Sequence, residues 1–210
     1  MKNKIDIIIS YFEELFPNPK PQLEYDSDYS LLIAVVLSAQ TTDVRVNEVT
    51  KILFNKYKSL EELSKADIKD IESIIRVLGT YTRKSRYVKE IATDLVNKYD
   101  GVVPTDRKEL ESLSGVGHKT ANVFLNEYYD IPAIAVDTHV SRVSKRLGLA
   151  NNKDDVLRVE NKLKKIYDKS TWGRRHLQML LFGRYYCKAI NPKCDTCKLK
   201  DICKYKKKKS

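Results

Sequence analysis

Apolar residues recur at helical spacing along almost the whole chain, and no run keeps the two-residue alternation of a half-buried strand. This pattern predicts an all-α fold. Helices are expected at residues 5–15, 31–39, 44–57, 59–66, 68–77, 83–99, 138–147, 153–167 and 174–186. The segment 31–39 is apolar on nearly every face, which indicates the central helix of its domain.

Two further helices are separated only by a short run that contains two glycines. Within LSGVGHKTA, Gly115 and Gly117 end one helical run, and a second run begins near Lys119. A hairpin this tight is expected to need positive φ, which glycine adopts at the least cost. Without side chains in the bend, the backbone amides of residues 115–119 are expected to reach a phosphate oxygen.

Two ionisable residues near this hairpin are candidates for chemistry. Lys119 falls in the first turn of the second helix, where the helix dipole disfavours a cation by about 0.3–1 kcal/mol. A lysine amine is also a nucleophile that enzymes use. Asp137 ends the apolar run IPAIAV and could cap the helix that follows. A solvated lysine and a structural cap are the simpler interpretations of either residue alone.

Composition narrows the class of partner. The 210 residues include 39 Lys and Arg against 28 Asp and Glu, a net charge of +11, which favours a polyanionic partner. A membrane is the weaker choice, because no apolar run approaches the ~18 residues of a spanning helix. Asp6, Glu13 and Glu14 interrupt the amino-terminal apolar pattern, which argues against a signal peptide. We therefore expect a cytoplasmic protein.

All four cysteines lie close together near the carboxyl end, as Cys187-x6-Cys194-x2-Cys197-x5-Cys203. In a cytoplasmic chain this grouping indicates a metal site rather than two disulfides. Tetrahedral zinc and a 4Fe-4S cluster both fit the spacing and the ligand type. The loop has no apolar pattern, so the metal is expected to form its core.

A longer pattern joins these features. LSGVGHKTAN is preceded by LLIAVVLSAQTTD and followed by IAVDTHVSRV and the cysteine spacing. Together they resemble the endonuclease III family of helix-hairpin-helix DNA glycosylases over nearly the whole chain. The resemblance implies two lobes with the active site between them. One is a six-helix lobe at 22–132, and the other joins 1–21 to 133–210 and binds a 4Fe-4S cluster rather than zinc.

The resemblance also implies roles for individual residues. Lys119 and Asp137 would be catalytic, and Cys187, Cys194, Cys197 and Cys203 would hold the cluster. The DNA contacts would come from Gln40, Thr80, Tyr81, Gly115, Val116, Gly117 and His118. Gln40 would fill the gap left by a nucleotide that is rotated out of the duplex. Ser114, His118 and Thr80 depart from the usual Pro, Arg and bulky apolar wedge of the family.

The implied activity is base-excision repair of double-stranded DNA by a monomer at the nucleoid. The enzyme would remove a damaged base, expected to be an oxidised pyrimidine, and cleave 3′ of the abasic site by β-elimination. A monofunctional mismatch glycosylase is one alternative, although such relatives usually lack a lysine at the position of Lys119. A non-catalytic DNA-binding module or redox sensor is the other, and it would need neither Lys119 nor Asp137.

Overall fold

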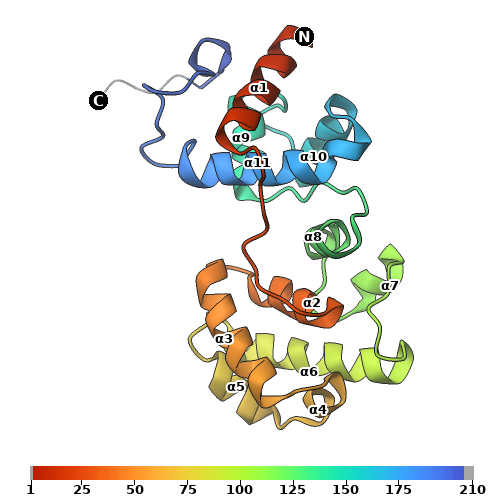
Figure 1. The fold of residues 1–210 in the computed structure, drawn as a ribbon. Helices are drawn as coiled ribbons and strands as arrows, with labels where there is room; N and C mark the ends of the chain where they lie inside the picture. Colours follow the sequence, from red (N-terminus) through yellow and green to blue (C-terminus); the bar gives the residue numbers. More distant parts are fainter. Residues whose placement is uncertain (1, 206–210) are drawn as a thin grey trace. The chain divides into compact units, whose positions relative to one another are not determined.

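The computed structural model describes residues 2–205, and within them it contains helices and no strand, as the apolar periodicity predicted (Figure 1). The chain divides into two compact units. One is Gln22–Tyr129, and the other combines Met1–Pro21 with Asp130–Ser210.

The unit Gln22–Tyr129 is built around one apolar helix. It contains α2 (Asp28–Leu37), α3 (Asp43–Lys56), α4 (Leu60–Lys65), α5 (Ile68–Ile75), α6 (Tyr81–Lys98), α7 (Arg107–Ser112) and α8 (His118–Tyr129). Every residue of α2 from Ser30 to Leu37 is buried, and the helix contacts α3, α6 and α8. The prediction of a central helix is therefore confirmed.

The ends of α2 differ from the predicted 31–39. The helix begins earlier, because Ser27 caps it in a reciprocal pair of hydrogen bonds with Ser30. It ends at Leu37, and the amide of Thr41 then donates to the Ser38 carbonyl over 3.1 Å. This turn places Gln40 in the left-handed region, with φ of 57°.

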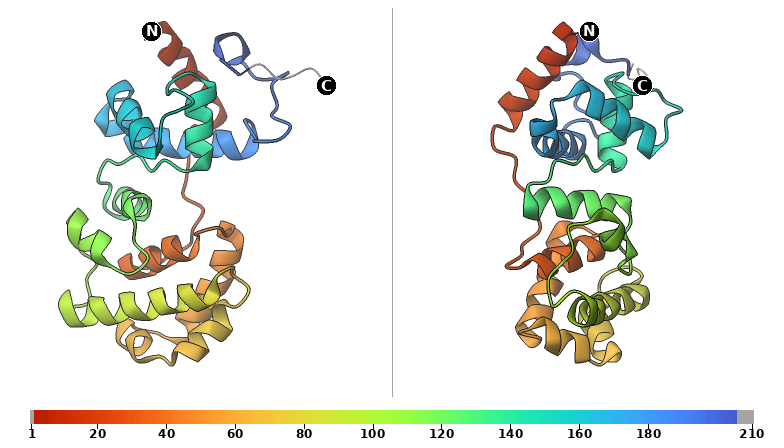
Figure 2. Two further views of the ribbon diagram at one scale, coloured as in Figure 1. Left: turned by 180° about the vertical axis from the view of Figure 1, so that it is seen from behind. Right: turned by 90° about the vertical axis from the view of Figure 1, so that its right-hand side faces the viewer.

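The second unit packs its amino-terminal helix against its last long one. It contains α1 (Lys2–Leu15), α9 (Thr138–Arg146), α10 (Val156–Ile166), α11 (Trp172–Tyr185) and the short 3₁₀ helices η1 (Lys169–Thr171) and η2 (Lys200–Ile202) (Figure 2). Phe12 of α1 lies with its ring centroid 5.1 Å from that of Phe182 in α11. Glu13 pairs with Arg174 and Arg175, whose hydrogen bonds lower its pKa to about 2.

Candidate nucleic-acid interface and metal centre

The hairpin between α7 and α8 requires glycine at one of its two positions. Gly115 has φ of 77°, in the left-handed region, as predicted. A Cβ added there would lie 2.5 Å from Cδ2 of Tyr87, a side chain of α6 that supports the bend. Gly115 is therefore fixed both by backbone conformation and by the absence of space.

The same prediction is wrong for Gly117. Its φ is outside the left-handed region, and a Cβ added to it would meet nothing within 4 Å. Fewer backbone amides of residues 115–119 are available to a phosphate than predicted, because the Val116 amide donates to the Leu113 carbonyl over 3.1 Å. The Val116 side chain is 5% exposed and belongs to the core of its unit. The fold thus gives no reason for glycine at 117.

This contrast predicts different consequences for two similar substitutions. Gly117→Ala should keep the thermal stability of the wild type, but should weaken binding to every DNA duplex by about tenfold if a phosphate approaches the amide here. Gly115→Ala should lower both stability and binding. Melting curves and binding isotherms measure the two effects. A Gly117→Ala defect confined to one lesion would show that the hairpin reads the base instead.

His118 is held inside the hairpin by its neighbours. Its Nδ1 lies 3.3 Å from Glu111 Oε1, and its Nε2 lies 3.3 Å from Asn122 Nδ2. Arg107 completes the network by donating to Asn122 Oδ1 over 2.7 Å. The His118 side chain therefore ties α7 to α8. Its backbone amide lies in the first turn of α8, where amides have no partner within the helix.

Lys119 and Asp137 occupy the positions on helix starts that the sequence predicted. Lys119 is exposed and is the second residue of α8, at the positive end of its dipole. Asp137 is the N-cap of α9, and its Oδ1 accepts a 2.7 Å hydrogen bond from the Val140 amide. The buried residues Ala133–Val136 fix the chain just before it. Because the cap engages Oδ1, the carboxylate keeps lone pairs for other contacts.

Gln40 and Thr80 share an unusual backbone conformation. Both are exposed, and both have positive φ, 57° for Gln40 and 59° for Thr80. Asn and Asp tolerate this region, whereas Gln and Thr do so at a cost on the order of 1–3 kcal/mol each. Tyr81 follows as the first residue of α6 and packs partly into the core. Such strain concentrates at functional sites, so it supports a role for both loops.

Lys84, a buried lysine on α6, was not predicted from the sequence as a site residue. It is 2% exposed, and its ammonium donates to the Ala39 carbonyl over 2.8 Å and to the Thr41 hydroxyl over 2.9 Å. A signal was present in the sequence, because Lys84 lies in phase with the buried Val88, Ile91 and Leu95. A lysine on the apolar stripe of a helix needs a partner in the interior.

The four cysteines form a loop suited to a metal cluster. All four thiols are free and partly buried, and three of them, Cys187, Cys197 and Cys203, pack against the core of their unit. Burial raises the pKa of Cys197 and of Cys203, and the neighbouring thiols raise both further. Thiolates gathered in this way need a bound cation to compensate them, so the donor set fits an iron–sulfur cluster. No three ligating side chains among residues 2–205 are arranged for a single metal ion.

Two arginines of α9, also missed from the sequence, hold this loop. Arg142 Nε donates to the Cys187 carbonyl over 2.9 Å, and Arg146 Nη1 donates to the Lys188 carbonyl over 2.7 Å. Arg146 Nη1 also lies 3.4 Å from Cys187 Sγ. The helix that Asp137 caps is thereby fastened to the segment that carries the cluster ligands.

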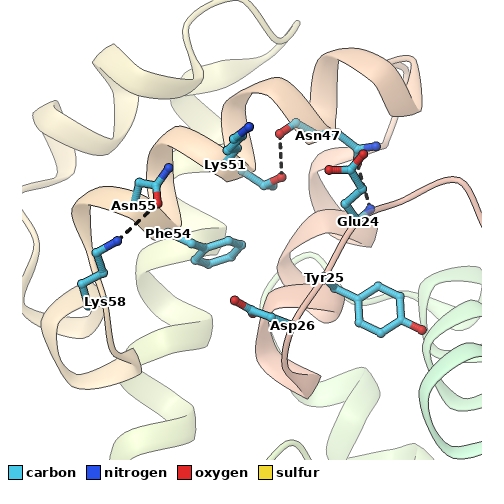
Figure 3. Close-up of a pocket in the computed structure, with 9 residues that line it drawn as sticks. Glu24, Tyr25, Asp26, Asn47, Lys51, Phe54, Asn55 and Lys58 are labelled. Carbon is cyan, nitrogen blue, oxygen red and sulfur yellow. Dashed lines mark hydrogen bonds between the residues drawn. The ribbon is translucent and has the colours of Figure 1, made fainter.

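A pocket of about 390 Å³ lies at the side of α3 (Figure 3). Acidic, basic and amide side chains share its wall, which is lined by Glu24, Tyr25, Asp26, Asn47, Thr50, Lys51, Phe54, Asn55 and Lys58. None of the predicted site residues is among them. Its mixed charge does not fit a phosphate backbone, so the pocket does not mark the DNA site. Within residues 2–205, the helices are too short or too polar to cross a bilayer.

Comparison with known proteins identifies the family. Residues 33–169 match the model of the HhH-GPD superfamily base excision DNA repair proteins, and residues 187–203 match the iron-sulfur binding domain of endonuclease III. Endonuclease III of Bacillus subtilis (strain 168) is 41% identical over 201 residues, which cover 96% of this chain and 92% of that protein. The chain belongs to the endonuclease III family.

Other relatives extend the likeness over the same length. Endonuclease III of Escherichia coli (strain K12) is 39% identical over 201 residues, 96% of this chain and 95% of that protein. The structure of a trapped endonuclease III–DNA covalent intermediate superposes with a TM-score of 0.93 at 45% identity, covering 97% of this chain and 95% of that one.

Membership of the endonuclease III family decides between the alternatives. The chain is a base-excision repair enzyme, a DNA glycosylase with abasic-site lyase activity, and not a non-catalytic binding module. Its cofactor is a 4Fe-4S cluster rather than zinc. When bound, the cluster supplies the loop with a covalent core.

Purified protein should therefore be yellow-brown, with about four iron and four sulfide per chain. Cys197→Ser should lower the iron content and weaken DNA binding, because the loop around the cluster, which carries Lys193, Lys198, Lys200 and Lys204, loses its core. Metal analysis, visible absorption and binding isotherms measure this. Stoichiometric zinc without visible absorption would contradict the cofactor, and normal DNA binding by a cluster-free variant would contradict its structural role.

Proposed function

We propose that Lys119 and Asp137 of this enzyme remove oxidised pyrimidines from double-stranded DNA and then cleave the strand 3′ of the resulting abasic site. The observation that carries the proposal is the exposed amine of Lys119, which directly follows the hairpin at the positive end of α8. A relative 45% identical to this chain has been trapped as a covalent intermediate with DNA, which supports a nucleophile on the protein.

The reaction begins with rotation of the damaged nucleotide out of the duplex. The reacting atom, C1′ of the sugar, is hidden in stacked DNA, and extrusion costs a few kcal/mol, less at a damaged pair. The exposed Gln40 fills the space that the nucleotide leaves, and Thr80 with Tyr81 holds the bent duplex open. Thr80 is smaller than the usual wedge of the family, so Tyr81 takes a larger part. The amides of the hairpin bind a phosphate and set the register.

The amine of Lys119 then attacks C1′. A C1′–N bond forms to the lysine while the bond from C1′ to the base breaks, and the base leaves with that electron pair. Opening of the sugar ring gives a Schiff base, which acidifies the proton at C2′. Loss of this proton and cleavage of the C3′–O bond release the 3′ phosphate by β-elimination. Water then hydrolyses the Schiff base and regenerates the amine.

Asp137 supplies the negative charge that these steps need. As base departure begins, positive charge develops on C1′ and the ring oxygen, and a nearby carboxylate stabilises it. The same carboxylate takes a proton from the Lys119 ammonium so that the amine can attack. We further propose that the enzyme works as a monomer on the DNA of the nucleoid in the cytoplasm, with Gln22–Tyr129 acting as the lobe that carries the hairpin and the other unit acting as the cluster lobe.

A panel of duplexes tests the proposed specificity. Duplexes that carry an oxidised pyrimidine or an abasic site should be cleaved 3′ of the lesion, whereas mismatches of undamaged bases should be processed far more slowly. Gel assays of base release with and without alkali separate base removal from strand cleavage. Preferential release of an undamaged mismatched base without strand cleavage would contradict the proposal.

A further inference from the structure

The side chain of Lys84 joins the loop that carries Gln40 to the first turn of α6, the helix that follows Thr80. Lys84 lies one turn into α6, and its backbone amide donates to the Thr80 carbonyl over 3.1 Å. Its ammonium reaches the other loop, where it donates to the Ala39 carbonyl over 2.8 Å and to the Thr41 hydroxyl over 2.9 Å. These two acceptors stand on either side of Gln40.

The hydrogen bonds of Lys84 go to a turn that is also stabilised by a hydrogen bond of its own. The loop from Ser38 to Thr41 also contains a 3.3 Å hydrogen bond from the Thr41 hydroxyl to the Ala39 carbonyl, so both acceptors of Lys84 belong to one compact turn. Hydrogen bonds from a charged donor are stronger than those between neutral groups. An ammonium that bridges the residues before and after Gln40 therefore holds its left-handed backbone from both sides.

Burying the Lys84 ammonium costs free energy of folding, so stability alone does not explain a lysine at this position. Lys84 is 2% exposed, and its two acceptors are a carbonyl and a hydroxyl rather than a carboxylate. Burial, with a smaller contribution from Arg83, lowers the pKa of Lys84, which means that the surroundings oppose the charged form. An apolar side chain would fill the same space without that opposition.

We propose that Lys84 is a positioning residue that fixes the Gln40 loop against the start of α6, so that Gln40 and Thr80 enter the duplex in a set relation. This inference rests on the proposed functions of Gln40 and Thr80. Lys84 does not touch the DNA in this account, and it acts through the loop that it holds. The gap in the duplex is filled only when Gln40 is presented in its left-handed conformation.

The test compares Lys84→Met with a matched variant, Lys89→Met, in the intact enzyme. Lys89 is on the same helix, but its ammonium donates to the Ala66 carbonyl. Ala66 is not part of the loop that carries Gln40. Lys84→Met should lower cleavage of an abasic site in duplex DNA by about tenfold relative to cleavage in single-stranded DNA, where no gap opens. Lys89→Met should leave that ratio unchanged. In the free enzyme, amide exchange at residues 38–42 should rise only in Lys84→Met.

The Gln40→Ala variant separates the two levels of the proposal. If Lys84 acts through Gln40, then Lys84→Met with Gln40→Ala should have the same ratio as Gln40→Ala alone. A normal ratio in Gln40→Ala refutes the role of Gln40 itself. A low ratio in Gln40→Ala with a normal ratio in Lys84→Met refutes the role of Lys84. Should Lys84→Met fail to fold, Thr41→Val, which removes one acceptor, decides by the same ratio and the same exchange measurement.

Discussion

Lys119→Gln should abolish both borohydride trapping and strand cleavage on a duplex that contains an abasic site. Borohydride reduces a Schiff base to a stable amine, so only an enzyme with its nucleophile in place is captured on DNA. Glutamine keeps most of the length of the lysine side chain but has no amine. Because Lys119 is exposed, its replacement should leave the fold and most of the DNA affinity intact. Denaturing gels measure both the covalent complex and the cleaved strand.

Lys108→Gln is the matched control. Lys108 is an exposed lysine in the first turn of α7, the other helix of the hairpin. Its replacement should reduce binding slightly at low salt and leave trapping unchanged. Trapping of Lys119→Gln at the level of the wild type would mean that another amine attacks C1′.

Asp137→Asn should slow release of a damaged base by about 100- to 1,000-fold, because the charge that stabilises the developing cation is gone. Asparagine is as good an N-cap as aspartate, so α9 should keep its hydrogen bond to the Val140 amide and the fold should keep its stability. A substrate that is already abasic should be affected much less, since its base-release step is complete. Single-turnover rates on the two substrates measure the difference.

The unit that contains Asp137 has another aspartate that caps a helix. Asp155 caps α10, and its side chain accepts a 2.8 Å hydrogen bond from the Arg158 amide. Asp155→Asn should therefore match Asp137→Asn in thermal stability and match the wild type in base release. Equal rates for the Asp137 and Asp155 variants would reduce Asp137 to a structural cap.

Much of this fold could be predicted because its signals are local. The apolar periodicity predicted the helices, and Asp137 marked a helix start that the structure shows as a side-chain cap. The hairpin followed from Gly115, whose positive φ is a property of a single residue. The cysteine spacing predicted a metal loop for the same reason, since the four ligands lie close together in the chain.

The features that were missed depend on contacts between distant parts of the sequence. Lys84 contacts Ala39 and Thr41, which lie 45 and 43 residues before it in the sequence. No local pattern predicts a contact over such a separation. Arg146 reaches the cysteine loop in the same way. The prediction of positive φ at Gly117 was wrong for a different reason. Of the two hairpin glycines, only Gly115 has positive φ, and residue 117 needs no conformation that favours glycine.

The most direct test of the account is to locate the covalent bond in the wild-type enzyme. Borohydride-trapped complex, digested with nuclease and trypsin, should yield a sugar adduct on Lys119 when the peptides are sequenced by mass spectrometry. Because trypsin does not cleave after a modified lysine, the adduct should lie in a peptide that spans residues 109–142. An adduct on any other lysine, or on the amino terminus, would contradict the assignment of Lys119 as the nucleophile.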